Sequence, residues 1–496
     1  MQFKSTLILY HVICLAAVCA QLFIGGSFVL CLALYLISIF ATVPFIKKGK
    51  WYPGDVFFIF ACLYYGTLTL IVKTVVNQPV QQNIFAESDT IIYLITGFVS
   101  IFVGYLFSTI TLNFKQAAFK LGSGVSDIYF LKNRTLPIFL VGCVFAILHV
   151  IFAPKVIPGT DLQTAGFGGF GSLEFLISFG VVCQTCLMIL ENKNQKHKII
   201  LVLMFSFTLV ISVAANSKGA FIKPLLSMIM AIAFYGNLKV KLGHVLGVAS
   251  GLLFVFFILS PIVHIMRSDK FELGLLDRLA NAIEILQKAD FDISKLKTQE
   301  EVVAAAIDFS NSPQGNYLFP SNLNADRFTL VGPIDMVARR YNSLGPLGLP
   351  VLGDIVNIIP GPFIKKEAAI SPDLIAWYYG FRQKGSVARP IVGLIASAIA
   401  LGGYIAVVFI PGIAMYATIV ALNFIGGPLR NNVWGIFVIG SSTFMIEGCV
   451  GQLPVFFARD YLFIIVTGFL LKSAMIRGAV ETQRLQRFSS SRRIRI

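Results

Sequence analysis

The amino-acid sequence predicts an all-α, polytopic integral membrane protein with about 12 transmembrane helices and one large helical loop outside the cytoplasm. Hydrophobic residues make up 56% of the 496 residues and charged residues only 13%, whereas about 25% of the residues of a soluble domain are charged. Apolar runs of about 18 residues or more recur along the chain, and each is long enough to cross a bilayer as a helix. One segment, 266–389, holds 14 acidic and 14 basic residues, so the whole net charge of +16 arises outside it.

Twelve apolar runs are predicted to cross the membrane, nine before the charge-balanced segment and three after it. The short Gly25-Gly26-Ser27 turn joins the first two runs. No small-residue cleavage site follows the first run, so we interpret it as a retained helix rather than a signal peptide. The predicted spans are 7–24, 27–46, 55–76, 90–112, 136–153, 172–190, 199–215, 220–236, 244–264, 403–424, 433–450 and 458–474.

The stretch 390–425 allows two interpretations. It is long enough for two spans, 390–410 and 412–425, divided at Pro411-Gly412. A second span would move the arginine-rich C-terminal tail to the outside, against the rule that lysine and arginine collect in cytoplasmic loops. We therefore predict a single crossing at 403–424. A short helix at 388–402 is expected to lie at the outer interface or to dip into it.

The distribution of lysine and arginine orients the chain. The lysines and arginines of alternate loops fall on one side of the membrane, from Lys4 to the tail that begins near Lys472. We assign this side to the cytoplasm, together with both termini. The chain then divides into four parts. These are transmembrane helices 1–9 (1–265), a large extracytoplasmic, periplasmic loop (266–389), an interfacial helix with transmembrane helices 10–12 (390–475) and a basic cytoplasmic tail (476–496). The same distribution explains the basic composition without nucleic acid as a partner.

The extracytoplasmic loop is predicted to fold into helices. Apolar residues recur at helical spacing over 271–289, and a second short helix is expected at 295–309. The stretch from Pro320 to Tyr341 is expected to form a turn and a third helix. The stretch from Gly345 to Pro362 is rich in glycine and proline and is expected to be irregular.

No sequence feature indicates a metal or another cofactor. Cys183 and Cys186 have CxxC spacing but lie in the middle of a predicted span, where we expect them to pack in the core. No histidine and cysteine residues have the spacing of a zinc site, and the Gly25-Gly26-Ser27 turn has no acidic residue to bind a divalent cation. The expected chemistry therefore needs neither a metal nor a cofactor.

Basic and titratable residues recur at the outer ends of the predicted spans. A cation at membrane depth is costly unless it is paired or hydrated, which makes each one a functional candidate, although a single lysine can also extend its ammonium to the headgroups. Because several spans contribute, we expect several of these side chains to face one cavity that binds an anion such as a lipid-linked diphosphate. The residues are Lys73, His149, Lys155, Lys218, Lys223, His264, Arg267 and Arg459.

The large loop adds three arginines. Arg327, Arg339 and Arg340 are interpreted as lying on one helix, and the last two either bind the anion or form a solvated face. Asp335 precedes Arg339 by four residues, the spacing of a helical ion pair. It is therefore either the partner of Arg339 or a catalytic base.

Glu447 is the only acidic residue of its predicted span and lies near the outer end of that span. Two interpretations follow from this position. The carboxylate either forms a structural ion pair with Arg459 or accepts a proton in catalysis.

Four short motifs are similar to those of a known family. They are Arg327-Phe-Thr-Leu with Arg339-Arg340, then Gly353-Asp-Ile-Val-Asn-Ile-Ile-Pro360-Gly-Pro-Phe-Ile-Lys365-Lys366, then Gly402-Gly403-Tyr404, and Asn216-Ser217-Lys218-Gly219. With the layout of the spans, they resemble the bacterial oligosaccharide repeat-unit polymerases of O-antigen and exopolysaccharide synthesis. The chain departs from that pattern at Lys218, where the family often has arginine, and at Gly361, where an arginine often follows the proline.

The resemblance implies a metal-independent glycosyltransferase of GT-C-like architecture in the bacterial inner membrane. Its donor would be a growing glycan on undecaprenyl diphosphate, and its acceptor the terminal sugar of a new lipid-linked repeat unit at the outer face. Membrane lipids, chain-length regulators and flippase proteins would be its partners. An O-antigen-type ligase and a lipid-linked glycan flippase or transporter are the alternatives, although a transporter often has internal repeats, which this sequence lacks.

The proposed chemistry assigns roles to nine residues. Cations are needed to stabilise the departing diphosphate, and a base is needed to take the proton of the acceptor hydroxyl. The diphosphate-binding candidates are Lys218, Arg267, Arg327, Arg339, Arg340 and Arg459; the candidate bases are Asp335 and Glu447, with His264 behind them.

Overall fold

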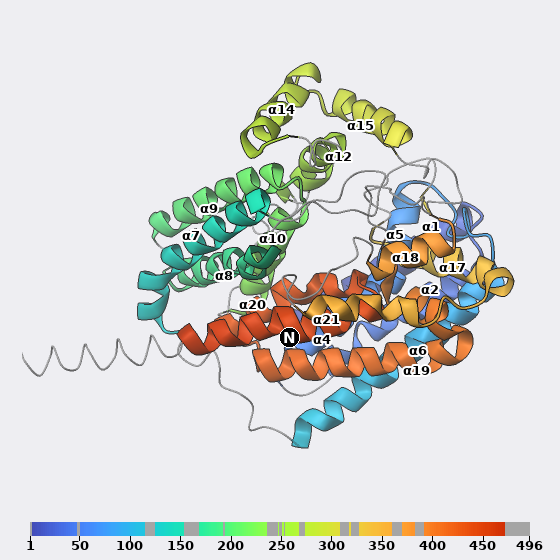
Figure 1. The fold of residues 1–496 in the computed structure, drawn as a ribbon. Coiled ribbons are helices and arrows are strands. Elements are labelled where there is room, and N and C mark those ends of the chain that lie inside the picture. The colour runs from blue at the N-terminus through green and yellow to red at the C-terminus, as the bar shows by residue number, and fades with distance from the viewer. Residues whose placement is uncertain are drawn as a thin grey trace, which may run out of the picture.

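The computed structural model describes residues 2–46, 50–114, 125–152, 168–191, 194–235, 247, 250–251, 253–266, 273–307, 317–318, 327–359, 370–381 and 391–471. Across these residues every regular element is a helix (Figure 1). By length and composition, eight helices within these ranges can cross a membrane: Phe28–Ile46, Pro53–Val75, Glu87–Thr111, Ile128–Phe152, Gly169–Leu190, Gln195–Ala214, Gly393–Gly426 and Val450–Leu471. The prediction of an all-helical, multi-pass membrane protein is thus confirmed.

Shorter apolar helices lie at three further predicted spans, Leu7–Phe23, Gly219–Phe234 and Val433–Glu447. The remaining predicted span, 244–264, is described only in part. The first half of the chain contains α1 (Gln2–Phe23), α2 (Phe28–Phe40), α3 (Val43–Ile46), α4 (Pro53–Cys62), the π-helical turn η1 (Leu63–Thr67), α5 (Leu68–Val75), α6 (Glu87–Phe114), α7 (Ile128–Phe152), η2 (Gly168–Leu173), α8 (Phe175–Leu190), α9 (Gln195–Ala214) and α10 (Gly219–Phe234).

The second half begins with the π-helical turn η3 (Val255–Leu259) and α12 (Ser260–Ile265). The large loop contributes α14 (Leu275–Lys288), α15 (Ile293–Ile307), α17 (Val331–Leu344), the 3-10 helix η4 (Leu349–Ile358) and α18 (Ser371–Tyr378). After the loop come α19 (Gly393–Gly426), α20 (Val433–Ser442), η5 (Thr443–Glu447), η6 (Val450–Gln452), α21 (Leu453–Val455) and the π-helical turn η7 (Phe456–Asp460).

Helices α6 and α19 run side by side (Figure 1). Their backbones approach closely because small residues face one another: a Cβ atom on Gly104 would lie 2.2 Å from the carbonyl oxygen of Gly412. Ser100 Oγ accepts a hydrogen bond of 2.9 Å from the Gly412 N–H at the same crossing. Small residues of this kind permit close helix contact where burial in lipid gives little driving force.

A kink interrupts α19 at Gly402 and Gly403, not at Pro411. Gly403 has φ 64°, a left-handed conformation that favours glycine. The ring of Tyr341 also packs against its backbone, so that an added Cβ would lie 2.2 Å from the Tyr341 hydroxyl. The kink lies at the predicted boundary between the interfacial helix (388–402) and the crossing (403–424). Pro411 and Gly412 lie within the helix.

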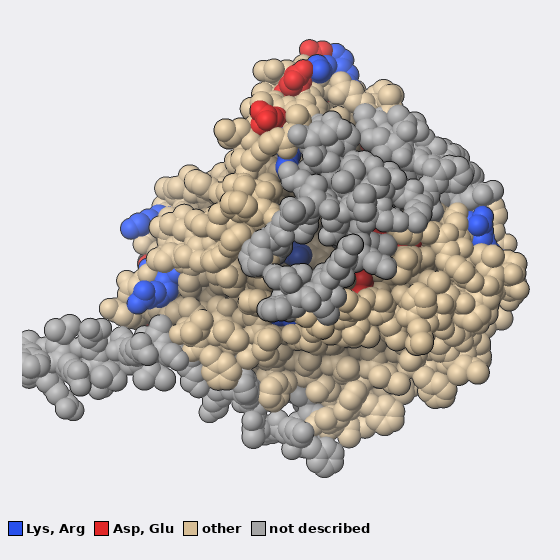
Figure 2. All heavy atoms as spheres, viewed as in Figure 1, with Lys and Arg blue, Asp and Glu red and all other residues tan. Residues whose placement is uncertain are grey.

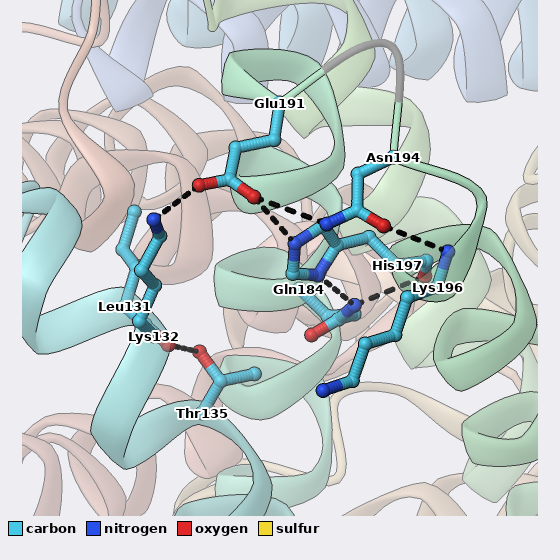
Figure 3. Close-up of polar contacts among 8 residues, drawn as sticks. All are labelled: Leu131, Lys132, Thr135, Gln184, Glu191, Asn194, Lys196 and His197. Carbon is cyan, nitrogen blue, oxygen red and sulfur yellow. Dashed lines mark hydrogen bonds and ion pairs between the residues drawn. The ribbon is translucent and has the colours of Figure 1, made fainter.

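Helices α7, α8 and α9 are fastened at one end by the carboxylate of Glu191 (Figure 3). It accepts hydrogen bonds from Lys132 on α7 and, at 2.9 Å, from His197 Nε2 on α9. Gln184 of α8 donates to the His197 carbonyl at 3.0 Å. The hydrogen bonds from Lys132 and His197 lower the pKa of Glu191 to about 2.

Acid is expected to weaken the contacts of Glu191 with Lys132 and His197. The pKa of Glu191 in the folded protein lies below its ordinary value of 4.5. Its contribution to stability is therefore complete above pH 4.5 and is lost as the pH falls from 4.5 towards 2. The Glu191→Gln variant should unfold at a lower temperature than the wild type at pH about 7, and the difference should shrink at pH about 3.

Thermal unfolding in detergent, followed by circular dichroism, measures this difference. Glu284→Gln is the matched control, because Glu284 is an exposed carboxylate paired with Lys288 at 2.7 Å on one helix. A difference between wild type and Glu191→Gln that is the same at both pH values would contradict the prediction.

The loop helices α14 and α15 form where the sequence predicted them and extend beyond the rest of the helical body (Figure 1). Arg278 fixes α14 to the end of α9. Its buried guanidinium donates from Nη1 to the Ala214 carbonyl at 2.8 Å and from Nε to the Leu273 carbonyl at 3.0 Å. A cation at the C-terminal carbonyls of a helix is favoured by the helix dipole.

The expectation of irregular structure from Gly345 to Pro362 is wrong over Leu349–Ile358, which forms the 3-10 helix η4. Tertiary packing imposes the helical turns. The Val351 carbonyl lies against Gly451, where an added Cβ would come within 2.2 Å of its oxygen. The Asp354 N–H also donates to Ser371 Oγ at 3.3 Å, and the Ser371 N–H donates to Asp354 Oδ1 at 3.2 Å.

Candidate functional site

Most of the predicted site residues fall into three clusters, and Arg267 lies outside the described residues. The Glu447 cluster contains Glu447, Arg327 and Tyr64. The Lys218 cluster contains Lys218, Ser260, His264 and Glu300. The Asp335 cluster contains Asp335, Arg339, Phe85, Ala86 and Thr90.

The carboxylate of Glu447 lies between a tyrosine of the helical body and an arginine of the loop. Tyr64 Oη donates to Oε1 at 3.0 Å, and Arg327 Nη2 donates to Oε2 at 3.0 Å. The Glu447 side chain is 10% exposed, whereas that of Arg327 is 52% exposed. The carboxylate is thus largely buried, and the guanidinium that neutralises it remains accessible.

Of the two interpretations of Glu447, the ion pair with Arg459 is wrong. Arg459 Nε instead donates to Asp460 Oδ1 at 2.8 Å, and Arg327 occupies the position beside Glu447. Proximity along the chain could not reveal this, because Arg327 and Glu447 are 120 residues apart.

The expectation that Arg327 shares a helix with Arg339 and Arg340 is also wrong. Helix α17 begins at Val331, and Arg327 lies in the turn before it. Pro333 has no N–H to donate to a carbonyl four residues earlier, which disfavours an earlier start of the helix. The turn is held against η1, because the Leu330 N–H donates to the Tyr64 carbonyl at 3.4 Å and the Phe328 ring lies 6.0 Å from the Tyr64 ring.

In the Lys218 cluster, three ionisable side chains from three helical segments form one hydrogen-bonded chain. Lys218 Nζ lies 2.8 Å from Ser260 Oγ and 2.8 Å from His264 Nε2, and His264 Nδ1 contacts the carboxylate of Glu300. An ammonium can only donate, so His264 Nε2 accepts and its Nδ1 carries the proton towards Glu300.

The Lys218 and Glu447 clusters lie at the same end of one antiparallel helix pair. Helices α10 and α20 pack together, and a Cβ on Gly440 would lie 2.4 Å from Ser227 Oγ. Near the other end of the pair, the Asn431 N–H lies 3.4 Å from the carbonyl of Phe234, the last residue of α10. Lys218 precedes α10 and Glu447 follows α20, so both lie at the opposite end from this contact.

The large loop reaches both clusters. Arg327 contacts Glu447, and Glu300 contacts His264, although the two loop residues lie on different segments. Basic and acidic side chains are visible near the centre of the face shown in Figure 2. The loop therefore contributes charge directly to two clusters of the helical body.

The Asp335 cluster has the geometry of a helix cap. Asp335 is buried, and its Oδ1 accepts hydrogen bonds from the N–H groups of Phe85 at 3.0 Å and Ala86 at 2.7 Å, and from Thr90 Oγ1 at 3.2 Å. These donors lie at the start of α6, where N–H groups lack helical partners. Burial raises the pKa of Asp335, against the lowering effect of these hydrogen bonds. Because three donors already occupy Oδ1, the carboxylate suits a structural role better than that of a base.

Arg339 belongs to the same cluster. Its guanidinium carbon lies 4.9 Å from the centre of the Phe85 ring, within the range of a cation–π contact. Burial lowers the pKa of Arg339, and the nearby charge of Asp335 opposes that effect. Arg340 lies elsewhere, against Gly380, where an added Cβ would come within 2.2 Å of its Nη1.

Lys73 is fully buried and serves to hold the loop. Its ammonium donates to Gln78 Oε1 at 3.1 Å and to the carbonyls of Gln82 and Tyr317, both at 2.8 Å. It also lies 4.0 Å from the centre of the Tyr317 ring. Lys73 thus attaches Tyr317 of the loop to the residues that follow α5.

Three residues of the Glu447 and Lys218 clusters were not predicted as site residues. Tyr64 belongs to an apolar run, Ser260 is one of several serines in spans, and Glu300 is one of two adjacent glutamates on an amphipathic helix. A structural signal accompanies these two clusters: η1 contains Tyr64, and η3 directly precedes Ser260. Single π-helical turns frequently occur at functional sites, but their positions are not encoded in a simple residue pattern.

The described residues contain no group of three histidine, cysteine, aspartate or glutamate side chains placed to hold a metal ion. Cys183 and Cys186 are both fully buried in α8, which confirms that they pack in the core. In comparisons with known proteins, no family model, no curated protein and no solved structure matches the chain. The functional assignment therefore rests on the residues of this chain.

Proposed function

We propose that the protein is a metal-independent glycosyltransferase that polymerises lipid-linked oligosaccharide repeat units at the outer face of the bacterial inner membrane, with both termini in the cytoplasm. The observation that carries the proposal is the position of Glu447 and Lys218 at the same end of the α10–α20 pair, each contacted by the large loop. A base and a cation thus lie at one end of the helical body, as transfer from a lipid diphosphate requires.

The reaction joins a growing glycan to a new repeat unit. The hydroxyl oxygen of the acceptor sugar attacks the anomeric carbon of the glycan carried on undecaprenyl diphosphate. A new carbon–oxygen bond forms, the bond from the anomeric carbon to the phosphate oxygen breaks, and the lipid diphosphate leaves with the electron pair. Glu447 takes the proton of the acceptor hydroxyl, as a general base.

The cations stabilise the leaving diphosphate. Lys218 and Arg327 are the leading candidates, because they belong to the two clusters at the common end of the helix pair. His264 and Glu300 hold Lys218 in place. Arg267, Arg339, Arg340 and Arg459 are further candidates, and chain-length regulators and a flippase are proposed protein partners.

A defined reaction with purified components tests the function. The protein in lipid nanodiscs is incubated with repeat units linked to undecaprenyl diphosphate, and the products are separated by length. A ladder of repeat lengths supports a polymerase, whereas a single transfer product would indicate a ligase. Movement of the substrate across a bilayer without a covalent product would indicate a transporter.

The Lys218→Met variant should slow the ladder reaction about 10- to 100-fold, because a hydrogen bond to a charged group contributes about 1.5–3 kcal/mol. Methionine keeps the length of the side chain and removes the charge. Lys295→Met is the control, because Lys295 is exposed on α15 and pairs with Asp290. A Lys218→Met rate equal to that of the control would remove Lys218 from the proposal.

A further inference from the structure

We infer that Glu447 occupies the anion position on Arg327 until a diphosphate replaces it, and that this exchange prepares Glu447 to act as a base. The inference rests on the proposed function and adds a mechanism that couples substrate binding to activation of the base. Its ligand is a diphosphate group, and its chemistry is a change of hydrogen-bond partner without a covalent step.

The two partners of Glu447 differ in accessibility. Tyr64 is buried and donates to Oε1, so this bond is fixed within the helical body. Arg327 donates to Oε2 from a side chain that is 52% exposed. An anion that approaches from outside therefore meets the guanidinium before it meets the buried carboxylate.

The backbone beside Arg327 is held while its side chain reaches outwards. Phe328 packs against Tyr64, and the Leu330 N–H donates to the Tyr64 carbonyl. The guanidinium can therefore change its partner by rotation of its own side chain, without movement of α17.

A diphosphate is a stronger partner for Arg327 than the carboxylate of Glu447. An ion pair that involves a half-exposed side chain contributes little to stability, because water screens it. A diphosphate offers several oxygen atoms and a higher negative charge, and it can accept two parallel hydrogen bonds from one guanidinium. The Arg327–Glu447 contact is thus weak enough to be replaced by the proposed ligand.

Loss of Arg327 changes the chemistry of Glu447. The carboxylate keeps its hydrogen bond from Tyr64, but its Oε2 loses the hydrogen bond from Arg327. Oε2 is then available to accept the proton of the acceptor hydroxyl. Because the change follows from diphosphate binding, the base is activated only when a lipid-linked diphosphate is bound beside it.

Binding of inorganic pyrophosphate to the purified full-length protein tests the exchange by calorimetry. Removal of the competing carboxylate in Glu447→Gln should tighten binding about fivefold, the upper range for an exposed ion pair. Arg327→Met should weaken binding at least about tenfold, and the double variant should bind as weakly as Arg327→Met. Glu284→Gln, which removes one negative charge from an exposed ion pair on α14, should bind as the wild type does.

A second measurement uses the wild-type protein and avoids any folding defect of a variant. Carboxylates are labelled with a carbodiimide and an amine, and the labelling of Glu447 is compared with that of exposed Glu301 by mass spectrometry. Exchange predicts that the ratio of Glu447 to Glu301 labelling rises when pyrophosphate is added. An unchanged or lower ratio, or Glu447→Gln binding no tighter than wild type, overturns the inference.

The outcomes separate this inference from the proposed function. Tighter binding by Glu447→Gln without any polymer ladder would support the exchange and contradict the polymerase. A ladder of repeat lengths without tighter pyrophosphate binding by Glu447→Gln would support the polymerase and overturn the exchange. Farnesyl diphosphate in a parallel titration distinguishes the ligand sources: tighter binding than pyrophosphate supports a lipid-linked diphosphate, and equal binding supports a free one at the same site.

Discussion

Replacement of Glu447 by glutamine is expected to lower the initial rate of polymer formation about 10²- to 10⁴-fold, the usual contribution of a general base. Glutamine has nearly the same size and keeps an oxygen that accepts hydrogen bonds from Tyr64 or Arg327, so the fold should persist. It cannot take the proton of the acceptor hydroxyl. The rate of ladder formation at saturating substrate measures the effect.

Two comparisons make this result specific. Glu301→Gln, an exposed glutamate on α15, should keep the wild-type rate. Glu447→Asp should retain part of the activity, because its carboxylate can still accept a proton from a shifted position. Unfolding temperatures should be alike for all variants, and a Glu447→Gln rate within about twofold of wild type would exclude Glu447 as a general base.

The variant Gly104→Leu is expected to cause the largest loss of stability, about 3 kcal/mol or more, because overpacked cores rarely relax fully. The first added atom, Cβ, would lie 2.2 Å from the Gly412 carbonyl oxygen and 2.9 Å from its carbonyl carbon. These are backbone atoms and cannot rotate away. Separation of α6 from α19 would also break the hydrogen bond between Ser100 and Gly412.

Thermal unfolding in detergent and the yield of monodisperse protein measure this effect. The neighbouring Val103 is exposed on the apolar surface of α6, so Val103→Leu adds bulk without a clash and should unfold like the wild type. Equal unfolding temperatures for Gly104→Leu and Val103→Leu would show that the α6–α19 contact contributes little to stability.

Several features of the fold were predictable because each depends on neighbouring residues alone. The apolar runs at Phe28–Ile46 and Gln195–Ala214 are long enough to cross a bilayer whatever they pack against. The helical period over 271–289 predicted α14, and the predicted boundary between the helix at 388–402 and the crossing at 403–424 coincides with the glycine kink in α19. Hydrophobic length, periodicity and glycine conformation are local properties, so the sequence reports them directly.

The partners of the charged side chains were not predictable in this way. Asp335 stands four residues before Arg339 in sequence, yet its carboxylate caps α6, about 250 positions away in the chain. One interpretation of Glu447 paired it with Arg459, but that arginine donates to the adjacent Asp460. A hydrogen bond needs contact within a few ångströms, and helix packing decides which distant segments come that close.

The sequence by itself thus determined a multi-pass helical body with a charge-balanced loop of 124 residues between its spans, because a bilayer selects for local hydrophobicity. Only the tertiary structure decided that Arg327 meets Glu447 and that His264 meets both Glu300 and Lys218. The physical reason is that a buried charge requires a partner, while the identity of that partner depends on how helices far apart in the chain pack together.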